Sequence, residues 1–147
     1  MAIGNRQSAM LYASAALLSL LGLADALYLT VEHVTGQSVQ CTIIAGCSEV
    51  LSSSYAEIGG VPLAALGAAA YFSVFSLSTL AAFGYRFAAT LLSPIIGAMF
   101  LVSLWLIYLQ AFVIRAFCQF CLFSAVITFA LLIVALIARF VPKRASV

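Results

Sequence analysis

The chain has 147 residues, of which 66% are hydrophobic and 7% are charged, and its formal net charge is +2. A soluble domain of this size would lack the polar surface needed to cover its core, so the composition excludes a water-soluble globular protein. We therefore expect membrane lipid as its surroundings and no nucleic acid as a partner.

Four apolar runs are each long enough to cross a hydrocarbon core of about 30 Å, which takes roughly 20 helical residues. They cover approximately residues 9–31, 61–83, 87–113 and 120–141. These runs account for most of the chain and leave no room for a separate soluble domain. We predict an all-α integral membrane protein with one domain over residues 1–147. Its four transmembrane helices would form a bundle, with an outer loop or lid of residues 32–60 between the first and second helix.

Positively charged residues orient this bundle. Arg6 precedes the first run and Arg86 lies in the link between the second and third. Arg139, Lys143 and Arg144 close the fourth run. With four crossings these positions share one side, which the positive-inside rule assigns to the cytoplasm. We therefore expect a protein of the inner or plasma membrane with cytoplasmic termini, and with its cysteines on the periplasmic or extracellular side.

The first run contains two features that each have alternative interpretations. Ala24-Asp25-Ala26 resembles a signal-peptide cleavage site, but the apolar run continues through Leu29, which favours a retained helix. Asp25 is the only acid inside a predicted span, about 10 Å below its outer end by helical rise. It is either a functional carboxylate, for example a proton relay, or a hydrogen-bonded side chain that helps helices to pack.

The outer loop is the long polar segment of the chain and carries two of the four cysteines. Apolar residues between Glu49 and Ile58 are spaced for a short helix, which Ser48 would cap. This helix is expected to lie as a lid over the outer end of the bundle, with both loop cysteines on a mobile part before it. Gly59-Gly60 is predicted to end the lid helix, and Pro62 to lie in the first turn of the next helix.

The second and third runs are predicted to be antiparallel neighbours, because residues 84–86 leave room only for a tight turn. Small residues in 64–70 allow close helix packing in lipid. Pro94 is expected to kink the third helix. Trp105 and Tyr108 follow Arg86 by about 28 to 33 Å of helical rise, which predicts an aromatic belt at the outer interface.

The last run opens on the dithiol motif Cys118-Gln119-Phe120-Cys121. Cys121 lies 18 residues before Arg139, or about 27 Å of helical rise, so the motif is predicted at the outer edge of the hydrocarbon. Backbone N–H groups at the helix start, and the S–H of the neighbouring cysteine, can stabilise a thiolate there. Arg115 is either an interfacial anchor or a cation that lowers the pKa of a nearby thiol.

Four cysteines allow several kinds of site. A c-type haem needs a histidine directly after C-x-x-C, and Leu122 stands there instead. His33 is the only histidine, so a zinc site lacks further ligands and no metal is expected. Two structural disulfides in a non-catalytic membrane adaptor remain an alternative. One pair at the lipid boundary and one in an aqueous loop favour an electron relay by thiol–disulfide exchange.

The order of these features resembles the vitamin K epoxide reductase family over nearly the whole chain. The matching features are four helices, Cys41 and Cys47 in the outer loop, Ser53 six residues after Cys47, and the C-x-x-C motif at the start of the last helix. The bacterial DsbB proteins carry the two cysteine pairs in the reverse order and are analogues. The resemblance implies a stand-alone homologue of the bacterial or archaeal type.

The resemblance also implies roles for individual residues. Cys41 would exchange with the partner, Cys47 would pair transiently with Cys118, and Cys121 would attack a quinone ring. Ser53 would donate a hydrogen bond to a quinone carbonyl. The four cysteines are then catalytic, and Ser53 and Cys121 bind a quinone of the ubiquinone, menaquinone or vitamin K type.

The function implied by the resemblance is a membrane thiol:quinone oxidoreductase that generates disulfides in extracytoplasmic proteins. The chain ends at Val147 without the thioredoxin-like domain that bacterial members often carry. A separate thioredoxin-like, DsbA-like thiol protein is therefore the expected partner. Ala125 stands where vertebrate members have a tyrosine, which favours quinone reduction over the alternative, a vitamin K quinone or epoxide reductase activity.

Overall fold

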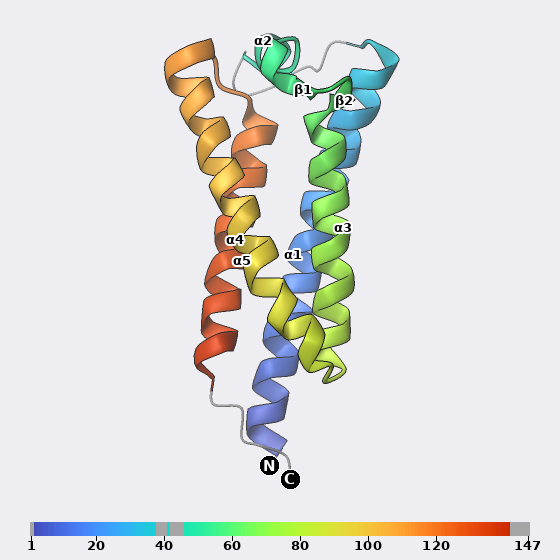
Figure 1. Ribbon diagram of the computed structural model, residues 1–147, viewed down its shortest axis with the longest axis vertical. Coiled ribbons are helices and arrows are strands. Elements are labelled where there is room, and N and C mark those ends of the chain that lie inside the picture. The colour runs from blue at the N-terminus through green and yellow to red at the C-terminus, as the bar shows by residue number, and fades with distance from the viewer. Residues whose placement is uncertain (1, 38–40, 42–45, 142–147) are drawn as a thin grey trace.

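The structure, a computed structural model, describes residues 2–37, 41 and 46–141 (Figure 1). Four long helices run side by side in this part of the chain, and short elements cover one end of them. In chain order the elements are α1 (Ala2–Thr35), α2 (Cys47–Leu51), the 3-10 helix η1 (Ser54–Ala56), β1 (Glu57–Ile58), β2 (Val61–Pro62), α3 (Leu63–Ala82), α4 (Arg86–Tyr108), the π-helix η2 (Leu109–Ile114) and α5 (Gln119–Phe140).

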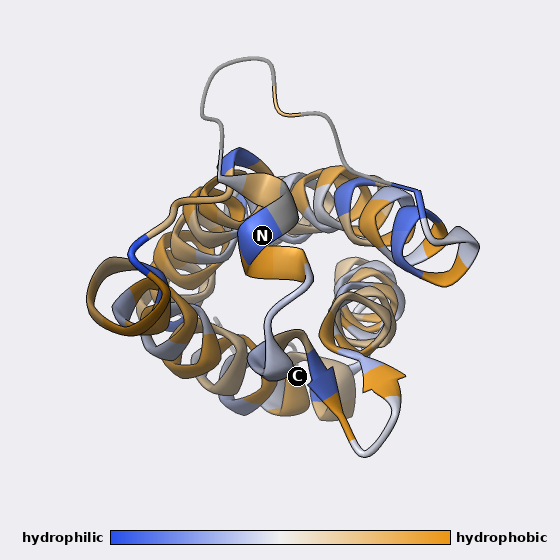
Figure 2. Ribbon diagram, turned by 90° about the horizontal axis from the view of Figure 1, so that it is seen from above, coloured by the Kyte–Doolittle hydropathy of each residue, from blue (hydrophilic) through white to orange (hydrophobic). Residues whose placement is uncertain are grey.

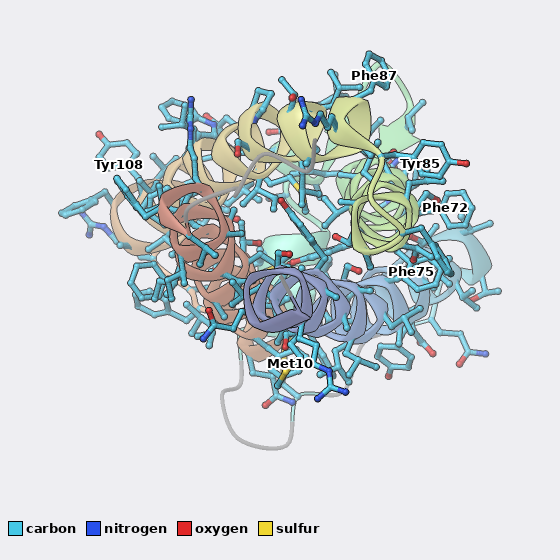
Figure 3. All side chains as sticks on the ribbon, turned by 90° about the horizontal axis from the view of Figure 1, so that it is seen from below. Met10, Phe72, Phe75, Tyr85, Phe87 and Tyr108 are labelled. Atoms are coloured by element: carbon cyan, nitrogen blue, oxygen red, sulfur yellow. A yellow bond between two sulfur atoms is a disulfide. The ribbon has the colours of Figure 1, made fainter. Side chains whose placement is uncertain are left out.

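All four long helices are apolar and long enough to cross a membrane. Hydrophobic residues predominate on these helices in the view from above (Figure 2). Large side chains such as Met10, Phe72 and Tyr108 point away from the bundle (Figure 3), and Met10 is 68% exposed. Such a surface is unfavourable in water and compatible with lipid. The predicted four-helix integral membrane fold is confirmed, although α1 begins earlier than residue 9 and ends later than residue 31.

The four long helices close into a ring, since α1 and α4 each pack against both α3 and α5. Small residues allow α1 and α3 to approach each other. A Cβ atom on Gly22 would overlap the ring of Tyr71, and one on Gly67 would come 3.9 Å from the Cβ of Ala26. The packing interpretation of the small residues in α3 is therefore supported, and Gly22 provides the space that Tyr71 occupies.

Tyr71 joins α3 to α5 through hydrogen bonds inside the bundle. Its hydroxyl lies 2.6 Å from Ser124 Oγ and 3.0 Å from Thr128 Oγ1. We expect Tyr71→Phe to lower the free energy of unfolding by about 1 kcal/mol, because Ser124 and Thr128 lose a partner in an apolar environment. Thermal unfolding in detergent measures this change. Tyr85→Phe is the control, since Tyr85 is exposed, and an equal loss in both variants would contradict the prediction.

The link between α3 and α4 is the predicted tight turn. α3 ends at Ala82 and α4 begins at Arg86, with Gly84 at φ +100°, a conformation that glycine adopts without strain. α4 continues as a helix through Pro94. The α-helical geometry then gives way to the wider π-helical turns of η2 before the last helix begins.

The lid differs from its prediction. α2 covers only Cys47–Leu51, so the predicted helix from Glu49 to Ile58 is wrong, and Ser48 lies inside α2 and not at its cap. Glu57–Ile58 instead pairs with Val61–Pro62 as an antiparallel hairpin. Gly59 and Gly60 have φ values of +60° and +83°, which suit a two-residue hairpin turn. Turn geometry therefore overrides the short apolar pattern.

Two other expectations about the lid also change. Pro62 precedes α3 at its N-cap and does not lie in its first turn. Cys47 is the first residue of α2 and is buried, so it belongs to the lid itself and not to a segment before it. Residues 42–45, in the segment between the loop cysteines, lie outside the described residues.

Candidate redox site

Three sulfur atoms meet beneath the lid. Cys41 and Cys47 form a disulfide with 5.9 Å between their Cα atoms, whereas Cys118 and Cys121 are free thiols. The Sγ atoms of Cys41, Cys47 and Cys118 all lie within 4.8 Å of one another. The site therefore holds one disulfide and two free thiols. In a non-catalytic adaptor with two structural disulfides, all four cysteines would instead be bonded. Because the loop sulfurs are bonded to each other, the cluster is not a set of free metal ligands.

The lid is held against the segment before α5 by close backbone packing at Gly46. A Cβ atom on this residue would come 2.5 Å from the Phe117 oxygen and 2.8 Å from the Phe117 nitrogen. Gly46 directly precedes Cys47, and both are buried. Only a glycine therefore fits where the lid brings Cys47 to Cys118.

Gln110 holds the other side of this contact. It lies in η2 with 2% of its surface exposed, and its Oε1 accepts a hydrogen bond of 3.0 Å from the Cys118 backbone N–H. Its backbone oxygen accepts a second bond from the Ala116 N–H at 3.1 Å. Gln110 is not among the site residues predicted from the sequence. The available signal was that Gln110 is the only amide side chain in the third apolar run.

Cys118 caps the N-terminus of α5 in an extended conformation, with φ −100° and ψ 120°. A hydrogen bond from the Cys121 side chain lowers the pKa of the Cys118 thiol from 9.0 to about 7, against the opposing effect of burial. Backbone N–H groups of Cys121 and Phe120 contribute in the same direction. Arg115 is exposed and is not among these causes, so the interpretation of Arg115 as the pKa-lowering cation is wrong.

The lowered pKa of Cys118 predicts a pH profile. A thiolate is the attacking species, so the rate at which Cys118 attacks the loop disulfide should rise with pH and level off above about 7. In Cys121→Ser and Cys121→Ala the resulting Cys47–Cys118 disulfide cannot pass on to residue 121, and only the released Cys41 thiol can reverse it, so acid quench preserves the fraction formed at each time. The serine variant retains an O–H donor and should level off near the same pH, whereas the alanine variant should level off at higher pH. Mass spectrometry after acid quench measures both curves, and coinciding curves would contradict the stated cause.

A cavity lies beneath the lid at the same end of the bundle. Its empty volume is about 920 Å³ including the open mouth, and most of its wall is apolar. Cys121 and Ser53 both line it, although they lie far apart in the sequence. The few polar side chains in this wall are Asp25, His33, Ser53, Tyr55, Tyr71, Ser103, Gln110 and Ser124. A mostly apolar pocket with few polar groups is typical of a site for a small organic molecule.

The hydroxyl of Ser53 is engaged within the lid. It donates a hydrogen bond of 2.7 Å to the Val50 backbone oxygen, and the residue stands at the N-cap of η1 without a side-chain capping bond. Ser53 therefore has to rotate to donate to a bound molecule.

His33 in the cavity wall connects α1 to the hairpin, because its Nε2 lies 2.6 Å from Glu57 Oε1.

Comparisons with known proteins agree with this arrangement. Residues 13–136 match the vitamin K epoxide reductase family. The chain is 35% identical over 119 residues to the thiol-disulfide oxidoreductase LTO1 of Arabidopsis thaliana, a match that covers 73% of this chain and 31% of that protein. The four membrane helices and the cysteine pairs are consistent with a redox role. The chain therefore belongs to the vitamin K epoxide reductase family, and its four apolar helices are those of an integral membrane protein.

Proposed function

We propose that the protein is a thiol:quinone oxidoreductase that generates disulfides in extracytoplasmic proteins. Electrons would enter from a separate thioredoxin-like, DsbA-like thiol protein at Cys41 and Cys47, pass to Cys118 and Cys121, and leave on a quinone. The observation that carries this proposal is the position of the C-x-x-C motif between two environments. Cys118 lies beside the loop disulfide, and Cys121 lines the apolar cavity. The name of the plant relative supports the thiol–disulfide part.

The exchange steps follow from the sulfur positions. A thiolate of the partner attacks Cys41 and forms a mixed disulfide, and the partner's second thiol then resolves it, so the partner leaves with a disulfide and the loop is left as a dithiol. Cys47 then attacks Cys118 and opens the Cys118–Cys121 disulfide. Cys41 closes the loop disulfide again and expels Cys118, whose lowered pKa makes it a good leaving group. These steps end with a loop disulfide and a free dithiol, which is the state that the structure has.

The cavity supports a quinone as the electron acceptor. A quinone ring is flat and mainly apolar, with two carbonyl oxygens that accept hydrogen bonds. Cys121 would act as the nucleophile toward this ring, and Ser53 would donate to one oxygen after releasing the Val50 carbonyl. An acceptor of the ubiquinone, menaquinone or vitamin K type fits these requirements, because each provides the same ring chemistry.

The orientation of the protein belongs to the same proposal. α1 begins and α5 ends at the end of the bundle opposite the lid (Figure 1). Arg6, Arg86 and Arg139 stand near helix ends on that side, and the positive-inside rule favours the cytoplasm for it. The lid and the cysteines would then face the periplasm or the cell exterior, with residues 1–147 acting as one membrane domain.

Reconstitution tests the proposed function directly. The purified protein in lipid discs should reduce a quinone only when a reduced thioredoxin-like protein is supplied, with one hydroquinone formed for every two thiols oxidised. Ultraviolet absorbance follows the quinone, and thiol labelling follows the protein partner. The proposal is overturned if none of the three quinone types is reduced, or if labelling finds a Cys41–Cys47 disulfide that never exchanges.

A further inference from the structure

A second ionisable group lies in the wall of the cavity that contains Cys121. Asp25 of α1 is 9% exposed and lines this cavity together with Ser53 and Cys121. Among the described residues no hydrogen bond or salt bridge to its carboxyl group is present. A buried carboxyl group without a partner is unfavourable in an apolar environment, and inside a membrane span it is by default a candidate functional group.

The neighbours of Asp25 explain why it is not simply a packing residue. Tyr71 of α3 already directs its hydroxyl to Ser124 and Thr128. His33, further along α1, is paired with Glu57 of the lid. The described cavity wall contains no lysine or arginine. Among the described residues, no other helix thus supplies a counter-ion or a hydrogen-bond donor that pairs with the carboxyl group of Asp25.

Ionisable groups from the neighbouring elements surround Asp25. α3 provides Tyr71 and α5 provides Cys121, which both line the same cavity as Asp25, and Cys118 lies immediately before α5. α4 and η2 contribute only neutral side chains to the described wall, among them Gln110. Cys121 is therefore the ionisable side chain of the dithiol that shares a cavity with Asp25.

We propose that Asp25 is the proton-transfer residue of quinone reduction, taking a proton from the Cys121 thiol and delivering it to a quinone oxygen. This inference rests on the proposed function. In the balanced reaction the S–H bonds of Cys118 and Cys121 break, the S–S bond between them forms, and two electrons and two protons pass to the quinone. Asp25 returns to its starting protonation state, so no outside proton donor is needed.

The chemistry requires such a group at this depth. Cys121 must lose its proton to become a nucleophile, and the reduced oxygen must gain one, while the apolar wall limits access of water. A carboxylate that lines the same cavity serves both needs. Exchange between the loop and Cys118 takes place in the sulfur cluster and does not require Asp25.

Separate half-reactions test the role of Asp25. In Asp25→Asn we expect quinone reduction by the pre-reduced dithiol to slow by about 100-fold or more, which is the usual contribution of a general acid or base. The transfer of electrons from the partner to Cys118–Cys121, measured without quinone, should stay within about twofold of the wild-type rate. Asp25→Glu should recover part of the quinone step. Glu32→Gln is the control, because Glu32 is an acid of α1 that does not line the cavity.

Two further measurements distinguish proton transfer from a structural role. The wild-type quinone step should slow toward acidic pH both as Cys118 becomes protonated and as Asp25 becomes protonated and ceases to act as a base, and Asp25→Asn should keep only the part of this decrease that Cys118 causes. Infrared difference spectra should show a carboxyl C=O band that changes when the dithiol is oxidised and that disappears in Asp25→Asn. An unchanged quinone rate in Asp25→Asn overturns the inference, as does equal slowing of both half-reactions. If wild-type protein reduces no quinone, the proposed function itself fails.

Discussion

Cys121→Ala is expected to abolish quinone reduction, with a loss of at least on the order of 10³-fold, as for removal of a covalent nucleophile. Cys121 is the free thiol that lines the cavity, whereas Cys118 faces the loop disulfide. In the variant a Cys47–Cys118 disulfide cannot pass on to residue 121 and is resolved only by return of Cys41, so acid quench should find more of it than in the wild type. Quinone absorbance measures the loss, and non-reducing peptide mapping measures the accumulated disulfide.

Phe123→Ala is the matched control for this experiment. Phe123 lies two residues further along α5, is exposed, and does not line the cavity. Its replacement should leave turnover close to the wild-type rate. Retained turnover in Cys121→Ala would remove Cys121 from the mechanism, and failure to trap the Cys47–Cys118 disulfide would argue against the relay between the two pairs.

Gly46→Ala is expected to slow electron transfer between the two cysteine pairs by about 100-fold, because small misplacements of reacting groups have effects of this size. The added Cβ would lie 2.5 Å from the Phe117 backbone oxygen, and a backbone atom cannot rotate away as a side chain does. The lid must therefore move, and Cys47 moves with it. Rapid acid quench followed by thiol labelling of Cys118 measures the rate.

The control for Gly46→Ala is Gly97→Ala. A Cβ on Gly97 meets nothing within 4 Å, and this glycine lies inside α4 without a positive φ. A small dithiol that reduces Cys118–Cys121 directly should also restore much of the quinone reduction in Gly46→Ala, because Cys121 and the helical part of the cavity wall do not depend on the lid contact. Normal exchange in Gly46→Ala would show that the lid contact does not position Cys47.

The lid shows where sequence reasoning fails. The apolar residues between Glu49 and Ile58 fit a helix, but over so short a segment the same residues also fit other structures. Gly59 and Gly60 reverse the chain and pair Glu57–Ile58 with Val61–Pro62. A pair of glycines is compatible with the predicted end of a helix, but two adjacent residues with positive φ are also the geometry of a hairpin turn.

The dithiol shows a second limit. The spacing of Cys118 and Cys121 indicates that one sulfur can stabilise the charge of the other, but it does not say which sulfur carries the charge. The structure assigns the lowered pKa to Cys118, because the Cys121 side chain and two backbone N–H groups point to its sulfur. Gln110 fixes this geometry from η2, and a π-helical segment has no simple sequence signal.

The four membrane spans, the turn at Gly84 and the location of the C-x-x-C motif at a helix start can all be predicted from the amino-acid sequence. These features depend on hydropathy over about 20 residues and on the fixed rise of a helix, which are local properties. The packing of Gly46 on Phe117, the contact of Cys118 with the loop disulfide, and the cavity shared by Asp25, Ser53 and Cys121 become visible in the folded structure. These are contacts between segments far apart in the chain, and they depend on how the helices and the lid pack together.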